Sequence, residues 1–215
     1  MALVVYHLEP CRTGYTQVPG GRFQSMARSG QIFRILDSIS DPSVDQAMAA
    51  ALPTADMDTA MRLVQSLLER RHTQSQMAMI RHFHQLDDSI KQLIIDQAPK
   101  LARILRHITQ HGHIQDQLNL VEIVHDAQDP KLCYLLADLL RYGQADAHED
   151  AASCLLDMAN RSLFLDDEAP ADDPVTRASS EHIDLLQQAI EQALTFYGVH
   201  QQPAVIEAML ETQPR

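Results

Sequence analysis

Three histidines at positions 107, 111 and 113 come nearest to a chemical site in this 215-residue sequence. His107 and His111 are four residues apart, so on a helix both imidazoles lie on one face within reach of one divalent ion. Zinc and iron sites recruit further ligands, and the nearest acidic residue downstream is Asp116. We therefore expect a solvated helix end, favourable for cations, with no metal or cofactor. His107, His111 and His113 remain the candidates for the alternative, a metal-dependent enzyme or metal sensor.

Basic side chains between positions 62 and 106 are the second group whose charge suggests a function. The candidates for contacting nucleic acid are Arg70, Arg71, Arg103 and Arg106, of which the last two are three residues apart and therefore neighbours on a helix. The net charge of -12 opposes the attraction to phosphate on which nucleic-acid binding mostly depends. Nucleic-acid binding is accordingly the second alternative, and a mixed solvated surface is the expectation.

The other reactive side chains indicate structural roles. His82 and His84 are two residues apart, so they face different sides of a helix and cannot share a ligand. Cys133 and Cys154 fall on apolar faces, where a free thiol behaves as a small hydrophobe, and with Cys11 they form no CxxC pair. No glycine-rich phosphate loop and no nucleophile elbow occurs. The sequence therefore predicts a protein that is not an enzyme, in a reducing, cytoplasmic setting.

Composition and charge narrow the class of protein. Apolar residues make up 45% and charged residues 21% of the chain, as in folded soluble proteins. No apolar run approaches the roughly 18 residues of a membrane span, and the first ten residues carry no basic start typical of a signal peptide. Residues 128–215 hold 5 basic and 16 acidic side chains, whereas residues 1–127 hold 12 and 13. The acidic C-terminal part predicts either a solvated surface or a face that attracts a basic partner.

Two stretches interrupt an otherwise helical pattern. Residues 1–22 contain Pro10, Pro19 and a Gly pair and show no apolar period, so we expect an extended N-terminal arm. From Phe23 apolar residues recur at spacings of three and four, and the expected helical domain covers residues 23–211. Within it, residues 162–178 hold five acidic residues and two prolines, which predicts a mobile loop insertion.

One short pattern recurs along this domain. Residues 41–48 can be laid over residues 87–94 and 129–136, at offsets of 46 and 42, and residues 202–209 begin a fourth copy. The pattern is typical of a helix start. Each copy begins with an Asp or Gln cap, which is followed by Pro in the first, third and fourth copies and then by apolar residues. Two further amphipathic stretches separate successive copies, so each unit is expected to contain three helices. The expected helices are 43–52, 56–71, 74–86, 88–98, 99–111, 114–127, 130–142, 146–161 and 179–197.

Three helices in a unit of 42 to 46 residues resemble the armadillo and HEAT repeat proteins over residues 41–211. The resemblance implies an all-α, right-handed α-solenoid of about three armadillo/HEAT-like three-helix repeats; an irregular helical bundle is the alternative. It also implies a non-catalytic scaffold that binds a protein partner, whose identity stays open. His148-Glu149 resembles a metal-binding pair of deoxyhypusine hydroxylase, a HEAT-repeat iron enzyme. That family needs several such pairs, so its ligand set is not transferred.

The fourth copy of the pattern stops after one helix. A solenoid must cover its last apolar face, and here Val205, Met209 and Leu210 come just before the end of the sequence. We expect either that the chain is part of a longer protein or is closed by a partner, or that this helix folds back on the third unit.

Overall fold

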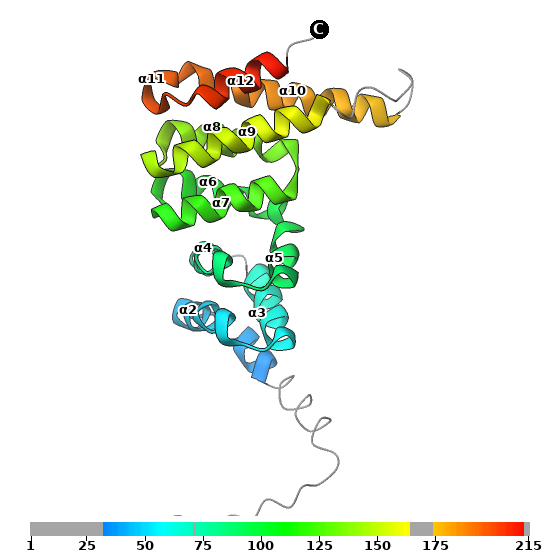
Figure 1. Cartoon of the computed structure of the whole chain (residues 1–215). Helices are drawn as coiled ribbons and strands as arrows, with labels where there is room; N and C mark the ends of the chain where they lie inside the picture. The colour runs from blue at the N-terminus through cyan, green and yellow to red at the C-terminus, as the bar shows by residue number, and fades with distance from the viewer. Residues whose placement is uncertain (1–31, 71, 164–173, 213–215) are drawn as a thin grey trace, which may run out of the picture. The chain divides into compact units, whose positions relative to one another are not determined.

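The structure is a computed structural model that describes residues 32–70, 72–163 and 174–212, and every regular element in these ranges is a helix (Figure 1). The chain divides into two compact units, Met1–Ile39 and Ser40–Arg215. In the first unit residues 32–38 are helical, as the apolar spacing predicts, while the predicted arm at 1–22 and the helix start at Phe23 lie outside the described residues. None of the described helices combines the length and apolar content that a membrane crossing requires.

The second unit contains the elements that concern function. Its helices are α2 (Pro42–Ala51), α3 (Met57–Arg70), α4 (Thr73–Arg81), α5 (Asp88–Ile95), α6 (Ala98–His111), α7 (Ile114–Ala127), α8 (Cys133–Tyr142), α9 (His148–Leu163), α10 (Pro174–Thr195), α11 (Tyr197–His200) and α12 (Pro203–Glu211). Four short 3-10 turns lie at Leu52–Thr54, Phe83–Gln85, Pro130–Leu132 and Ala145–Ala147. The predicted helix at 74–86 is thus shorter, because α4 ends at Arg81 and a 3-10 turn follows it.

Local sequence explains where several helices begin. The Asp41 carboxylate accepts a hydrogen bond from the Ser43 N–H at 2.8 Å, and Pro42 occupies the first position of α2. Asp129 accepts from the Lys131 N–H at 3.0 Å, which confirms it as an N-cap, here of a 3-10 turn. Asp87 occupies the predicted cap position of α5, but its side chain makes no capping hydrogen bond.

Most of the helices in the second unit contact the second next helix along the chain. Helices α2, α4, α6, α8 and α10 touch in succession, and so do α3, α5, α7, α9 and α12. Figure 1 shows these helices following one another from α2 to α12 along the second unit. The core lies between the two series, where Phe83, Leu105 and Leu120 are fully buried.

The predicted helix-start motif recurs at α2, α5, the turn before α8, and α12. Some helices also contact the third next helix, as α4 contacts α7 and α9 contacts α12. A capping motif records where a helix begins and not which helix covers its apolar face.

The loop predicted at 162–178 is also shorter. Helix α9 continues to Leu163, and α10 begins at Pro174, five residues before the predicted start. Proline is well suited to the first position of a helix, where its missing N–H is not needed. Residues 164–173, which hold the five acidic residues, lie outside the described part.

The last helix packs on α9 and α10. Val205 and Ala208 on its inner face are fully buried, whereas Ile206 and Leu210 on its outer face are 42% and 64% exposed. The inner face of the last helix is therefore covered by α9 and α10, while its outer face leaves two large apolar side chains exposed among the described residues.

Candidate functional site

A hollow lies between the end of α3, the start of α4 and the first half of α6. Its volume is about 710 Å³. Pockets for ligands commonly measure about 300 to 1,000 Å³. The lining residues of this α3–α4–α6 hollow are Leu68, Glu69, Thr73, Gln76, Gln97, Lys100, Leu101, Arg103 and Ile104.

Two cations stand at this hollow without an acidic partner. Lys100 donates to the Gln97 side-chain oxygen at 2.6 Å, and within the described residues neither Lys100 nor Arg103 forms an ion pair. Both lie on α6, three residues apart and therefore on one side of the helix. Since Glu69 is the acidic lining residue, the lining carries one net positive charge in a chain of net charge -12.

Gln76 lies against the hollow from α4. Its side chain is only 8% exposed, and its amide has no hydrogen-bond partner in the part of the chain that the structure describes. The amide atoms keep contact with solvent at the hollow. Leu101 and Ile104, which are 0% and 4% exposed, supply apolar surface beside it. The hollow therefore combines charge, an unused amide and an apolar floor.

A buried carboxylate holds the junction between α3 and α4 that forms one side of this hollow. Asp45 on α2 is fully buried and accepts hydrogen bonds from Arg70 and Ser75, and the His72 Nδ1 lies 3.1 Å from its Oδ2. Burial disfavours the charged form, but the hydrogen bonds from Ser75 and His72 and the charge of Arg70 outweigh it, so the pKa of Asp45 is lowered. Asp45 thus ties α2 to both flanks of the junction.

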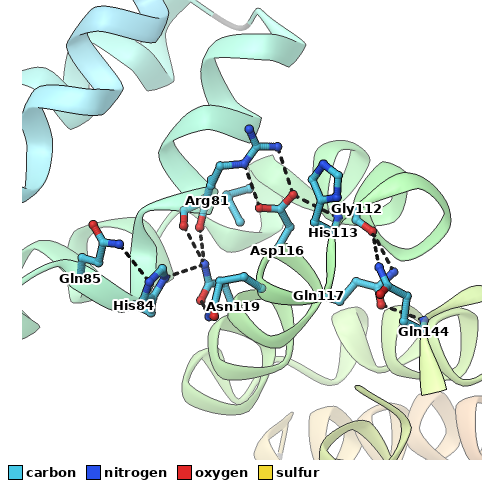
Figure 2. Close-up of polar contacts among 11 residues, drawn as sticks. Arg81, His84, Gln85, Gly112, His113, Asp116, Gln117, Asn119 and Gln144 are labelled. Carbon is cyan, nitrogen blue, oxygen red and sulfur yellow. Dashed lines mark hydrogen bonds and ion pairs between the residues drawn. The ribbon is translucent and has the colours of Figure 1, made fainter. Parts of the chain in front are cut away.

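Polar side chains of α7 join α4 to α7 (Figure 2). The Asn119 amide donates to the Ile80 carbonyl at 2.7 Å and to the Arg81 carbonyl at 3.2 Å, so it satisfies the C-terminal end of α4. The Asp116 carboxylate, 2% exposed, bonds the Arg81 guanidinium through two contacts of 3.3 Å and accepts from the His113 N–H at 3.2 Å. Both residues hold α4 against α7.

The Gln117 amide lies in the same way against backbone carbonyls at the C-terminal end of α6, and Figure 2 shows its contacts with Gly112 and Gln144. The Gln117 Nε2 lies 3.4 to 3.5 Å from the carbonyls of Ile108, Thr109 and Gly112, and its Oε1 accepts from the Gln144 N–H at 2.9 Å. Sequence reasoning missed Asp116, Gln117 and Asn119 as positioning residues. The available signal was that all three interrupt the buried face of a predicted amphipathic helix.

The predicted histidine cluster does not come together as three ligands. His107 and His111 are neighbours, with ring centroids 4.8 Å apart. Within the described residues, however, no group of three or more His, Cys, Asp or Glu side chains is arranged to hold a metal ion. His113 stands at the start of α7, and Asp116 is engaged by Arg81 and by the backbone.

The four candidate arginines are also separated by their partners. Arg70 is buried against Asp45, and Arg71 lies outside the described residues. The Arg106 Nε lies 3.2 Å from the Asp138 Oδ2, and its guanidinium lies 5.9 Å from the centroid of the Tyr134 ring. Arg103 is the candidate that lines the hollow. Among the described residues, Arg70, Arg103 and Arg106 therefore have three different surroundings.

The remaining sequence candidates have structural surroundings. Cys133 and Cys154 are buried, as predicted, and burial raises the pKa of each thiol to about 12. His148 is 5% exposed, with its Nε2 3.2 Å from the Gly143 carbonyl, and burial followed by the nearby His200 lowers its pKa. Its neighbour Glu149 is exposed, so the His-Glu pair does not share a site.

An acidic groove lies between α7 and α9. Its volume is about 270 Å³. The lining residues of this α7–α9 groove are Leu118, Val121, Glu122, His125, Asp150, Ser153, Cys154 and Asp157. Several of its charged groups already have partners: Glu122 accepts from the Lys91 ammonium at 2.6 Å, and the His125 Nδ1 and Nε2 lie 2.8 and 3.8 Å from Asp126 and Asp157.

Comparison of this chain with family models, with curated proteins and with solved structures found no match to any of them.

Proposed function

We propose that this chain is a non-catalytic scaffold that binds another protein through an α-solenoid. The observation that supports this proposal best is the contact pattern, in which α2, α4, α6, α8 and α10 touch in succession and α3, α5, α7, α9 and α12 do the same. A stack of this kind buries the inner helix faces and leaves the outer side chains available over a long surface. The right-handed sense of the solenoid is part of the proposal and comes from the resemblance to armadillo and HEAT repeats. A cytoplasmic setting is also part of the proposal, and it rests on the buried free thiols.

The proposal places the binding surface at the α3–α4–α6 hollow. Within the described residues its cations form no ion pair, and the Gln76 amide forms no hydrogen bond, so a ligand there gains contacts that the chain itself does not make. Interfaces depend most on groups that find their partners only on binding.

The solenoid part of the proposal is tested by native-state hydrogen exchange on the whole chain. In a stack held by neighbouring contacts, we expect protection to rise from α2 and α12 toward α6 and α7. A single opening free energy shared by all helices would favour the irregular bundle instead.

The binding part is tested by site-specific photo-crosslinking in cells of the source organism. A photoreactive residue at Thr73, on the edge of the hollow, is expected to capture one dominant protein, whereas the same residue at the exposed Asp146 is not. The captured protein is then produced alone and its affinity measured by calorimetry. Equal capture at both positions, or no binding by the purified partner, would contradict the proposal.

A further inference from the structure

Two buried histidines lie where the last helices of the second unit meet. We propose that His148 and His200 form a pH-sensitive switch, which holds the start of α12 in place while both imidazoles are neutral and releases it when they are protonated. The His148–His200 switch involves other helices than the α3–α4–α6 hollow and is independent of the function proposed for that hollow.

The hydrogen bonds of His200 require a neutral ring. His200 is 5% exposed, and its Nε2 lies 3.1 Å from the Ala193 carbonyl, so Nε2 carries a hydrogen and donates it. Its Nδ1 accepts a hydrogen bond from the Gln202 N–H at 3.0 Å, so Nδ1 carries a lone pair. One ring nitrogen donates and the other accepts only in the neutral imidazole, because both nitrogens donate in the imidazolium.

These two bonds join three helices at their ends. Ala193 lies in the last turn of α10, His200 is the last residue of α11, and Gln202 is the N-cap residue of α12. Backbone N–H groups at the start of a helix have no partner within it, and the His200 ring supplies one to Gln202. A hydrogen on Nδ1 would face the Gln202 N–H, and two donors form no bond, so protonation removes the link to α12.

His148 extends the switch to α8 and α9. It is the first residue of α9 and is 5% exposed, and its Nε2 lies 3.2 Å from the carbonyl of Gly143, which follows α8. The rings of His148 and His200 lie edge to face, with their centroids 6.3 Å apart. Burial lowers the pKa of His148 and the nearby His200 lowers it further, against the hydrogen bond to Gly143. Two cations this close repel each other, so protonation of both rings disfavours the packed arrangement.

The charged side chains nearest in sequence on the surrounding helices do not compensate a positive charge on the pair. Tyr197 contacts His200 edge to face, with the ring centroids 5.4 Å apart. Asp138 of α8 pairs with Arg106, and Arg141 lies over two aromatic rings. The Glu211 side chain is half-buried at the far end of α12, and the exposed carboxylates are those of Asp146, Glu149, Asp150, Glu191 and Glu207. Within the described ranges neither histidine forms an ion pair that would hold a proton on it.

The turn between α11 and α12 is built to respond to the loss of this bond. Gln201 has a φ of 53°, in the left-handed region that favours glycine. Such a conformation persists only where its surroundings hold it, here through the bond from the Gln201 N–H to the Tyr197 carbonyl and the bond from Gln202 to His200. Helix α12 has 9 residues, too few to be stable without packing. Loss of the second bond therefore frees the start of α12 and uncovers Val205, which is fully buried.

The test follows the whole chain by nuclear magnetic resonance between about pH 7.5 and about pH 5, the range in which histidine ordinarily takes up a proton. At the upper end, the ring nitrogen shifts of His148 and His200 are expected to show the neutral form with the hydrogen on Nε2. At the lower end, hydrogen exchange of the α12 amides, corrected for its intrinsic pH dependence, is expected to be at least about tenfold faster. The amide of Ile123, fully buried in α7, is expected to keep its protection within about twofold.

Substitutions assign the response to the two rings. His200→Asn keeps an acceptor for the Gln202 N–H but takes up no proton, and its α12 exchange is expected to vary less than about twofold over the same range. His148→Gln removes one of the two cations and is expected to reduce the acceleration at least about threefold. The matched control is His182→Asn, at an exposed position of α10, which is expected to keep the full response. Circular dichroism at the upper pH checks that each variant folds; if His200→Asn does not, the ring shifts and amide exchange of the unchanged chain decide alone.

Three results would overturn the inference. If both rings take up protons while α12 exchange stays constant, the pair does not control this helix. Equal acceleration at Ile123 and in α12 makes the effect one of global acid unfolding. A full response in His200→Asn, or its loss in His182→Asn, assigns the pH dependence to other groups.

Discussion

The α3–α4–α6 hollow and the α7–α9 groove are both formed where helices that follow each other in the fold leave a gap over a buried apolar floor. They differ in charge: Lys100 and Arg103 line the hollow, whereas Glu122, Asp150 and Asp157 line the groove. They also differ in how these charges are used. The cations of the hollow form no ion pair within the described ranges, while Glu122 is already bound to Lys91.

Helix packing creates both depressions, but unused bonding capacity distinguishes a candidate binding surface from a structural one. An acidic residue held at 2.6 Å by a lysine of the same chain has its best partner already, so a ligand gains less there. A cation that forms no ion pair within the described residues, such as Arg103, gains more.

The largest expected effect on stability is at Asp45, whose carboxylate joins α2 to the junction of α3 and α4 beside the hollow. Asp45→Asn removes the charge that pairs with the buried Arg70 and is expected to lower the free energy of unfolding by about 3 to 5 kcal/mol. Asp58→Asn, at an exposed position of α3, is the control and is expected to change it by less than about 0.5 kcal/mol. Urea unfolding followed by circular dichroism measures both, and similar midpoints for the two variants would refute the supporting role of Asp45.

The same carboxylate gives a pH dependence with a defined sign. Because the pKa of Asp45 is lower in the folded chain than its ordinary value of 3.8, its ionised form stabilises the fold above that value. This contribution is lost as the pH falls from about 3.8 through the folded pKa. Stability measured from pH 6 to pH 2 is therefore expected to fall less steeply in Asp45→Asn than in the unchanged chain, and parallel curves would contradict this.

On the groove side, Cys154 is expected to be chemically inert although it lines the groove. Burial raises its thiol pKa from 9.0 to about 12, so at pH 8 the thiolate fraction falls roughly 10³-fold. In a Cys11→Ser variant, Cys133 and Cys154 are expected to resist alkylation by iodoacetamide until urea is added. Mass spectrometry over time measures this, and rapid labelling of Cys154 in the folded chain would show that the groove opens.

Removal of the side-chain hydrogen bonds that join α4 to α7 is expected to have an intermediate effect on stability. Asn119→Ala leaves the carbonyls of Ile80 and Arg81 without their side-chain donor and is expected to cost about 1 to 3 kcal/mol. Gln65→Ala, at an exposed position of α3, is the reference. If calorimetric unfolding gives the same melting temperature for both variants, the Asn119 amide does not hold the two helices.

The smallest effect is expected for the ion pair that occupies the groove. The side chains of Lys91 and Glu122 are 19% and 38% exposed, and exposed ion pairs contribute about 0 to 1 kcal/mol. Lys91→Met is expected to destabilise the chain within this range and to make the loss smaller at 1 M salt, since salt screens the pair. A loss above about 2 kcal/mol, independent of salt, would point to packing of Lys91 over the Phe83 ring instead.

Local pattern was sufficient for much of the helical structure. The helix at 114–127 has the predicted bounds, α2 and α6 begin within one residue of their predicted starts, and Cys133 and Cys154 are buried as their apolar neighbours indicated. These features follow from interactions within a few residues, such as the bond from the Ser43 N–H to Asp41 and the apolar period of a single helix.

The candidate site required the tertiary structure, because its parts are distant in sequence. Arg103 was considered from sequence, but Gln76 and Lys100 were recognised as lining residues only from the hollow that all three share. Which helices contact one another depends on which faces meet. Asp45 meets Ser75 thirty residues away, and Asn119 meets Ile80 at a separation of 39. Apolar periodicity shows that a helix has a face to bury, but the choice of the helix that covers it is made by packing among all of them.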